Sequence, residues 1–159
     1  MNMREELEKN QQDDDGMKQR YLTFLTDDRL FGVPIAEVMQ IVEIQDITRM
    51  HDQQPYIKGI INLRGQIIPV IDMRLRLNIP EVSYNDRTCI VIMCVKDQNF
   101  GLIVDGVDEV IRILPEQISA PPESGLMGAE SFFTGIARIK KNNAGGEALA
   151  LLIRASEIL

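Results

Sequence analysis

Short apolar runs separated by turn residues dominate the chain from residue 20 onward. The runs are four to eight residues long, rich in Ile and Val, and bounded by Gly, Asp and Asn. This pattern is typical of strands joined by hairpins. Examples are YLTFLT before DDR, IINL before RG, and CIVIMCV before KDQN. The sequence therefore predicts a mainly β fold.

Helical signals are few and short. Asp72 is placed to cap one or two turns through MRLRL, and Ser156 precedes the final residues EIL, so we expect short helices in the Asp72 region and at the C-terminus. Residues 114–131 hold several prolines and glycines and are predicted to be irregular. Residues 140–147, KKNNAGGE, are polar and glycine-rich between two apolar runs, which predicts a flexible hairpin tip.

An internal repeat connects the two halves of the chain. Residues 31–44, FGVPIAEVMQIVEI, align without gaps on residues 100–113, FGLIVDGVDEVIRI, with identical Phe, Gly, Val and Ile at four positions. Two β units of about 60 to 70 residues would each have too small a core alone, so we expect them to pack together. Closing each unit into a barrel would also remove exposed strand edges.

The chain is best divided into a tail and one folded domain. Residues 1–18 are polar and acidic with almost no periodic apolar positions, and they predict a flexible acidic tail. Residues 19–159 form a single domain, with one subdomain at about 19–82 and a second at about 83–154. An exchange of terminal segments between the two barrels stays open at this point.

The charge and hydropathy limit the classes of partner. The 159 residues carry a formal net charge of -7, and an acidic body repels phosphate backbones, which argues against nucleic acid and against anionic lipid surfaces. No long hydrophobic span and no secretory signal are present, so direct membrane insertion is not expected and the cytoplasm is the default location.

No catalytic, metal-binding or cofactor-binding pattern is present. Cys89 and Cys94 lie five residues apart on a predicted strand and point to opposite faces, so they are interpreted as reduced core cysteines. His51 lies in the polar stretch MHDQQP and is interpreted as an exposed loop residue. Asp105 and Asp108 are interpreted as part of a turn at Asp105 and Gly106 rather than as a catalytic pair. The chain is predicted to be a binding protein and not an enzyme, with no cofactor and no metal.

Arg64 stands alone inside the apolar stretch GIINLRGQIIPVID, residues 59–72. Arg64 and Gly65 are predicted at the tip of a hairpin, where Gly65 supplies a positive φ. Arg64 either only makes a turn soluble or anchors a partner, because a guanidinium offers five donors and enters interfaces readily.

The stretch GIINLRGQIIPVIDMR, with VMQIVEI before it and GLIVDGVDEV after it, resembles the CheW family of bacterial chemotaxis coupling proteins. The resemblance runs from about residue 20 to residue 159 and includes the pattern GxxNLRGxxxPxxDxR, the GxxVDxV segment and the closing LLIRASEIL. It implies two SH3-like five-stranded β-barrels around a shared hydrophobic core. It also implies a non-enzymatic adaptor between chemoreceptors and the histidine kinase CheA.

The resemblance further implies a set of receptor-binding positions in a groove between the barrels. The partners that it implies are the cytoplasmic tip of methyl-accepting chemoreceptors, the regulatory domain of a CheA-type kinase, and other CheW copies in rings. The implied location is the cytoplasm, at receptor arrays on the inner face of the membrane. The receptor-binding positions in this chain are Val38, Asn62, Leu63, Arg64, Gly65, Val104, Asp105 and Val107.

The sequence departs from the family pattern at three places. Gln40 stands where many members have Glu, Arg154 stands where an acid or amide is usual, and the segment SGLMGAESFF does not align.

Three functions are alternatives to the receptor-to-kinase adaptor. The first alternative is a CheW-like scaffold of a non-flagellar chemosensory array. The second is a small β-barrel enzyme or ligand-binding barrel, which would need a deep polar cavity and a perturbed ionisable group. The third is a purely structural role in rings.

Overall fold

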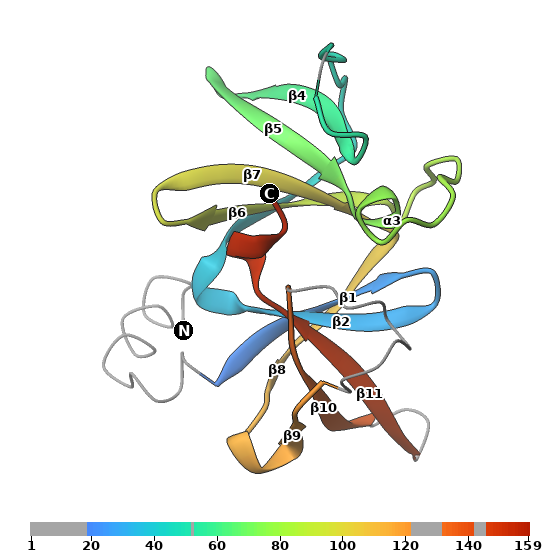
Figure 1. Ribbon diagram of the computed structural model, residues 1–159, viewed down its shortest axis with the longest axis vertical. Helices are drawn as coiled ribbons and strands as arrows, with labels where there is room; N and C mark the ends of the chain where they lie inside the picture. The colour runs from blue at the N-terminus through green and yellow to red at the C-terminus, as the bar shows by residue number, and fades with distance from the viewer. Residues whose placement is uncertain (1–18, 52, 122–131, 142–145) are drawn as a thin grey trace.

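A computed structural model describes residues 19–51, 53–121, 132–141 and 146–159. The described chain forms two β-sheets, one above the other along the long axis in Figure 1. The lower sheet has the spatial order β8, β1, β2, β11, β10, β9 and the upper sheet the order β3, β6, β7, β5, β4. The lower strands are β1 (Arg20–Thr26), β2 (Arg29–Pro34), β8 (Gly106–Arg112), β9 (Ile118–Ser119), β10 (Phe133–Lys141) and β11 (Gly146–Ile153). The upper strands are β3 (Val38–Glu43), β4 (Ile57–Leu63), β5 (Gln66–Asp72), β6 (Cys89–Val95) and β7 (Gln98–Val104).

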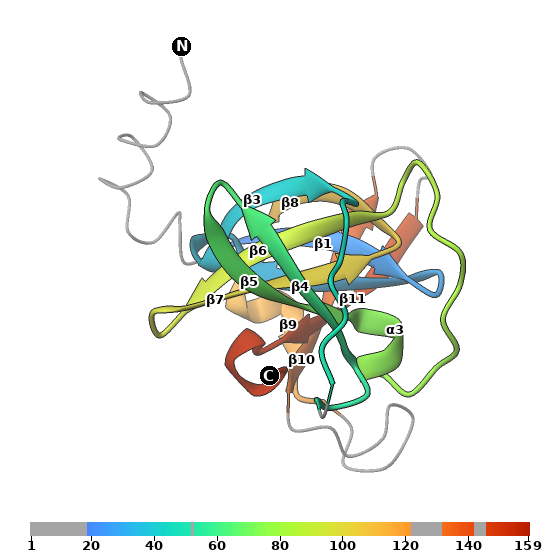
Figure 2. The same cartoon turned by 90° about the horizontal axis from the view of Figure 1, so that it is seen from above.

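The predicted mainly β fold with two packed units is confirmed. The two-residue strand β9 brings the lower sheet to six strands, whereas the upper sheet has the five expected. Seen from above in Figure 2, the β4–β5 hairpin lies over β6 and β7. The two sheets are compatible with two SH3-like barrels.

Each sheet takes strands from both halves of the sequence. The hairpin β1–β2 pairs with β8 and β11 from the second half, and the hairpin β6–β7 pairs with β3 and β5 from the first half. The sheets therefore do not coincide with residues 19–82 and 83–154, and the division of the chain at about residue 82 stays a prediction. The internal repeat has a structural meaning, because in each copy the chain crosses from one sheet to the other, from β2 to β3 and from β7 to β8.

Three apolar clusters explain the continuous apolar runs. The shared core between the sheets takes side chains from both of them, including Phe31 of β2 and Phe100 of β7. A second cluster lies within the lower sheet and a third within the upper sheet. On β6, Val91 packs in the shared core while Ile90 packs in the upper cluster, so both faces of that strand are covered. A strand that is buried on both faces needs apolar residues at every position.

The short helices lie where they were predicted. Asp72 caps α3 (Met73–Arg76), and its carboxylate accepts hydrogen bonds from the backbone N–H groups of Arg74 and Leu75. The C-terminal helix is the 3₁₀ turn η3 (Ala155–Glu157), which lies between the sheets near the C-terminus in Figure 1. A further 3₁₀ turn, η1 (Ile35–Glu37), joins β2 to β3.

Two local predictions need correction, and three lie wholly or partly outside the described residues. Residues 115–119 are regular, because Pro115 opens the 3₁₀ turn η2 (Pro115–Gln117) and β9 then pairs with β10. Cys89 and Cys94 are free, but both are half-buried rather than fully buried. Outside the described residues lie the predicted tail at 1–18, residues 122–131 of the segment predicted to be irregular, and residues 142–145 of the predicted hairpin tip.

Candidate functional site

The tip of the β4–β5 hairpin is a two-residue turn at Arg64 and Gly65. Leu63 pairs with Gln66, and the φ angles of Arg64 and Gly65 are +53° and +86°. Two positive φ angles between paired strands are the requirement of a type I′ turn. The Asn62 side-chain oxygen accepts a hydrogen bond from the Gly65 backbone N–H at 2.8 Å. The predicted positive φ at Gly65 is confirmed, and Asn62 has a structural role in holding the turn.

Arg64 offers its guanidinium to solvent. Its side chain is exposed and makes no hydrogen bond or ion pair with any residue that the structure describes. Leu63 instead packs against the apolar cluster of the upper sheet. Directly across from Asn62 lies Ile67, which is 61% exposed. The tip therefore joins an unpaired cation to an exposed apolar side chain that the sequence pattern did not single out, because Ile67 stands inside a continuous apolar run.

Asp105 joins the two sheets. It lies at the bend between β7 and β8, and its carboxylate accepts hydrogen bonds from Arg74 Nε at 3.1 Å and from Arg74 Nη2 at 2.7 Å. The backbone N–H of Asp27, in the β1–β2 turn, donates to the same carboxylate at 2.9 Å. Because Arg74 belongs to α3 beside the upper sheet, these contacts fasten α3 to the lower sheet. We call the contacts of the Asp105 carboxylate with Arg74 and with the Asp27 backbone the Asp105 clamp. The arginine of the DxR pattern thus meets the aspartate of the VDxV pattern.

The electrostatics of this pair keep both groups charged. Burial acts to raise the pKa of Asp105, but the hydrogen bonds from Arg74 and from the Asp27 backbone, with the Arg74 charge, lower it overall. The hydrogen bond with Asp105 is the main cause of a raised pKa for Arg74. Asp108, the other acid of the segment, pairs with Lys141 on β10. The two acids therefore bind different cations, which agrees with the interpretation that they are not a catalytic pair.

The three predicted valines lie around the shared core. Val38 and Val107 hold equivalent positions of the internal repeat, and both are half-buried against that core. Val104 is only 1% exposed, so its side chain is not available at the surface. Val107 and Asp105 line a groove of about 710 Å³ between the sheets. Val38 instead begins β3, where it pairs with Met93.

The predicted site residues form separate groups in the structure. Strand β5 runs parallel to β7 with Asp72 opposite Ile103, and Gln66 lies six residues earlier on β5. At about 3.3 Å per residue, the hairpin tip is about 20 Å from the Asp105 end of the upper sheet. Figure 1 shows the tip on the left and α3 on the right. Asn62 to Gly65 therefore lie together, and Val104 to Val107 lie together, but the two groups do not meet.

Two further sequence interpretations concern His51 and metals. His51 is exposed in the β3–β4 connection, as expected. Within the described ranges, no group of three or more His, Cys, Asp or Glu side chains is arranged to hold a metal ion. Among the helices in the described part of the chain, none has the length and apolarity to cross a bilayer.

A comparison with protein families places the whole described fold. A family model described as CheW-like domain matches residues 20–159. The chain belongs to the CheW family. The match covers both sheets, and both groups of predicted site residues lie within it.

Individual relatives of this CheW-family chain agree with the match. The chemotaxis protein CheW of Klebsiella aerogenes is 30% identical over 141 residues, covering 89% of this chain and 81% of that protein. The chemotaxis protein CheW of Bacillus subtilis is 37% identical over 105 residues, covering 66% and 67%. Protein FrzA of Myxococcus xanthus is 27% identical over 135 residues, covering 85% and 82%. The crystal structure of the scaffolding protein TtCheW from Thermoanaerobacter tengcongensis superposes with a TM-score of 0.75 at 34% identity, covering 87% and 90%.

The clamp predicts how the stability of this CheW-family chain depends on pH. The pKa of Asp105 is lower in the folded state than its ordinary value, so the unfolded chain binds the proton more tightly. The stability from this group is present above the ordinary pKa of about 3.9 and is lost as the pH falls through the lower folded value. We expect urea unfolding to show a decline in stability below about pH 5 that is smaller in Asp105→Asn. Equal declines in the two proteins would contradict a role of Asp105 in this dependence.

Proposed function

We propose that this protein is a non-enzymatic chemotaxis adaptor that couples chemoreceptors to a CheA-type histidine kinase. Support comes from its membership in the CheW family, a family of scaffold and adaptor proteins, and from relatives that are named as chemotaxis proteins. The solved relative is named as a scaffolding protein. The proposed location is the cytoplasm, at receptor arrays on the inner face of the membrane.

The exposed tip of the β4–β5 hairpin is the observation that carries the receptor side of this proposal. Arg64 is held by a type I′ turn, has no partner among the described residues, and stands near the exposed Ile67. A guanidinium next to an apolar side chain suits a helical partner that offers a carboxylate or helix-end carbonyls beside an apolar stripe. We infer that the tip makes the polar contact to the receptor.

The other predicted receptor positions take different parts in the proposal. Val38 and Val107 offer half-buried apolar surface on either side of the shared core. Val104 and Asp105 act indirectly, since one is buried in that core and the other is held by Arg74. The full proposed receptor-binding set is Val38, Asn62, Leu63, Arg64, Gly65, Val104, Asp105 and Val107.

The proposals for the kinase partner and for the assembly state rest on membership in the CheW family alone. We propose that the regulatory domain of the CheA-type kinase is the second partner and that copies of this protein also join rings. The similarity to FrzA supports a second candidate function, that of a scaffold in a chemosensory array that does not control flagella. Reconstitution with the kinases encoded by the same organism distinguishes the two, because only the cognate kinase should respond.

Replacing Arg64 with alanine should weaken receptor coupling by about 1 to 3 kcal/mol, the usual cost of losing one interface anchor. The measurement is phosphate incorporation by the cognate CheA-type kinase in the presence of receptor-containing membranes, as a function of adaptor concentration. The variant should need a higher concentration for half-maximal stimulation, while its melting temperature stays close to that of the wild type, since Arg64 is exposed and unpaired.

Arg138→Ala is the matched control, because Arg138 is an exposed arginine on β10 of the other sheet. It should stimulate the kinase as the wild type does. A lower melting temperature for Arg64→Ala, in parallel with its loss of coupling, would show that Arg64 is structural. No stimulation by the wild-type protein with any receptor and kinase pair would overturn the adaptor proposal itself.

A further inference from the structure

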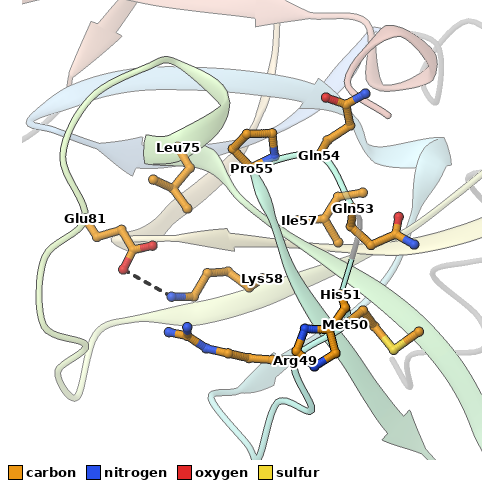
Figure 3. A pocket seen from close by; sticks show the side chains of 10 residues that line it. All are labelled: Arg49, Met50, His51, Gln53, Gln54, Pro55, Ile57, Lys58, Leu75 and Glu81. Carbon is orange, nitrogen blue, oxygen red and sulfur yellow. Dashed lines mark hydrogen bonds and ion pairs between the residues drawn. The ribbon is translucent and has the colours of Figure 1, made fainter.

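A small polar cavity lies beside β4 of the upper sheet, and none of its lining residues belongs to the hairpin tip or to the Asp105 groove. It has a volume of about 300 Å³ and is shown in Figure 3. Its walls come from the β3–β4 connection, from β4, from α3 and from the loop that follows α3. The side chains that matter for its chemistry are Arg49, His51, Lys58 and Glu81.

Lys58 is the fixed cation of this cavity. It lies on β4, and its side chain is only 15% exposed. The ammonium group donates a hydrogen bond to the Glu81 carboxylate at 3.1 Å and lies 5.8 Å from the centre of the Tyr84 ring. The Tyr84 hydroxyl in turn donates to Asp72, the cap of α3, at 3.0 Å. Lys58 is therefore held in place by Glu81 and Tyr84, and Tyr84 is itself hydrogen-bonded to the cap of α3.

Arg49 and His51, in the β3–β4 connection, add two further donors. Neither side chain makes a hydrogen bond or an ion pair with a residue that the structure describes. Their segment is nonetheless anchored, because the backbone of Thr48 exchanges two hydrogen bonds of 2.9 Å with Ile60 on β4. In Figure 3 the Arg49 side chain extends toward the side of the cavity where Lys58 meets Glu81.

Glu81 is the only carboxylate among the described residues that line the cavity. Its side chain is 44% exposed, and Lys58 is the partner that it contacts. Arg49 and Lys58 against Glu81 give two positive charges and one negative charge, a balance of +1 before any protonation of His51. The chain as a whole carries -7. A locally positive cavity in an acidic protein attracts an anion.

We propose that this cavity binds an oxyanion, a carboxylate or a phosphate group, through Arg49, His51 and Lys58. Glu81 then competes with the anion for Lys58, because its carboxylate accepts the hydrogen bond of the Lys58 ammonium when no ligand is bound. Guanidinium and ammonium groups donate charge-assisted hydrogen bonds to an oxygen-bearing anion, and the imidazole offers a further donor. The cavity shares no residue with the proposed receptor-binding set, and it would exist whether or not the chain is an adaptor.

The single histidine of the chain makes the test specific. The His51 ring signals are followed by NMR while sodium phosphate or sodium acetate is added to the full-length protein at fixed pH, with sodium chloride used to keep the ionic strength constant. We expect a saturable shift with at least one of the two anions. A stronger response to phosphate identifies a phosphate group as the ligand chemistry, and an equal or stronger response to acetate identifies a carboxylate. No saturable shift beyond that of chloride alone overturns the proposal.

Three variants should have different effects on the dissociation constant of the anion. Arg49→Gln should raise the dissociation constant about three- to tenfold through the loss of one charged donor. Glu81→Gln should lower the dissociation constant, because it removes the competitor while keeping the shape. Arg138→Gln, on the other sheet, should change nothing. Tighter binding by Arg49→Gln, weaker binding by Glu81→Gln, or an equal effect of Arg138→Gln would each overturn the assignment.

Discussion

Arg74→Met should lower the free energy of unfolding by about 2 to 3 kcal/mol, because it leaves Asp105 charged and half-buried without its main partner. The Arg74 side chain is 16% exposed and that of Asp105 is 31% exposed. The expected cost lies below the 3 to 5 kcal/mol for breaking a fully buried pair, since water still reaches the carboxylate. Methionine keeps about the length of the apolar stem of arginine and removes the guanidinium.

A double-mutant cycle with Asp105→Asn isolates the pair. Each single variant and the double variant are unfolded in urea at neutral pH, and we expect a coupling energy of about 1 to 2 kcal/mol between the two positions. Arg74 also faces Asp27 at 3.7 Å, so the single Arg74 variant should cost more than the single Asp105 variant. Strictly additive costs would show that the pair does not hold α3 against the β1–β2 turn.

Local features of this fold could be predicted from the sequence because their causes are local. Gly65 reads as a turn residue because a positive φ suits glycine, and the turn forms at that position. Asp72 reads as a helix cap because its carboxylate reaches the backbone N–H groups just ahead, and it does so here. The exposed guanidinium of Arg64 follows from the same local argument, since a side chain at a hairpin tip has few neighbours.

The distribution of strands between the sheets could not be predicted, because it depends on pairings between distant segments. Strand β2 pairs in parallel with β11, and β5 pairs in parallel with β7. In both places a glycine of the repeat, Gly32 or Gly101, faces a large side chain of the parallel partner, Leu152 or Val70. The repeat shows that these glycines are equivalent, but no local pattern indicates which strand fills the space above them.

The Asp105 clamp was missed for the same reason. Asp105 and Arg74 are 31 residues apart, and their contact exists only once β7 has paired with β5 and brought α3 beside the bend. The sequence assigned Asp105 to a turn and to a receptor surface, whereas the structure adds a cation partner to it. Sequence resemblance found the DxR and VDxV patterns separately, and geometry joins them.

The largest loss of stability is expected from Gly59→Ala. Gly59 lies on β4 with a φ of +150°, and an added Cβ would lie 2.1 Å from the Thr48 carbonyl oxygen. That oxygen accepts the hydrogen bond from the Ile60 backbone N–H, so it cannot move away without breaking the bridge. Steric overlap and backbone strain together should lower the free energy of unfolding by about 3 to 5 kcal/mol.

Gly65→Ala is the matched control for this prediction. Gly65 also has a positive φ, of +86°, but an added Cβ there would meet no atom within 4 Å. Its cost should be limited to backbone strain, about 1 to 2 kcal/mol. Urea unfolding of the two variants separates the steric part from the strain, and equal costs would show that the Thr48 segment yields easily.

Hydrogen exchange locates the damage from Gly59→Ala. The amides of Thr48 and Ile60 bond to each other's carbonyl groups, so both should exchange faster in this variant than in Gly65→Ala. Because Thr48 precedes Arg49, an opened bridge also frees Arg49 from its position at the cavity. Gly59→Ala should therefore weaken oxyanion binding at the cavity, while Gly65→Ala, which leaves the bridge intact, should bind as the wild type does.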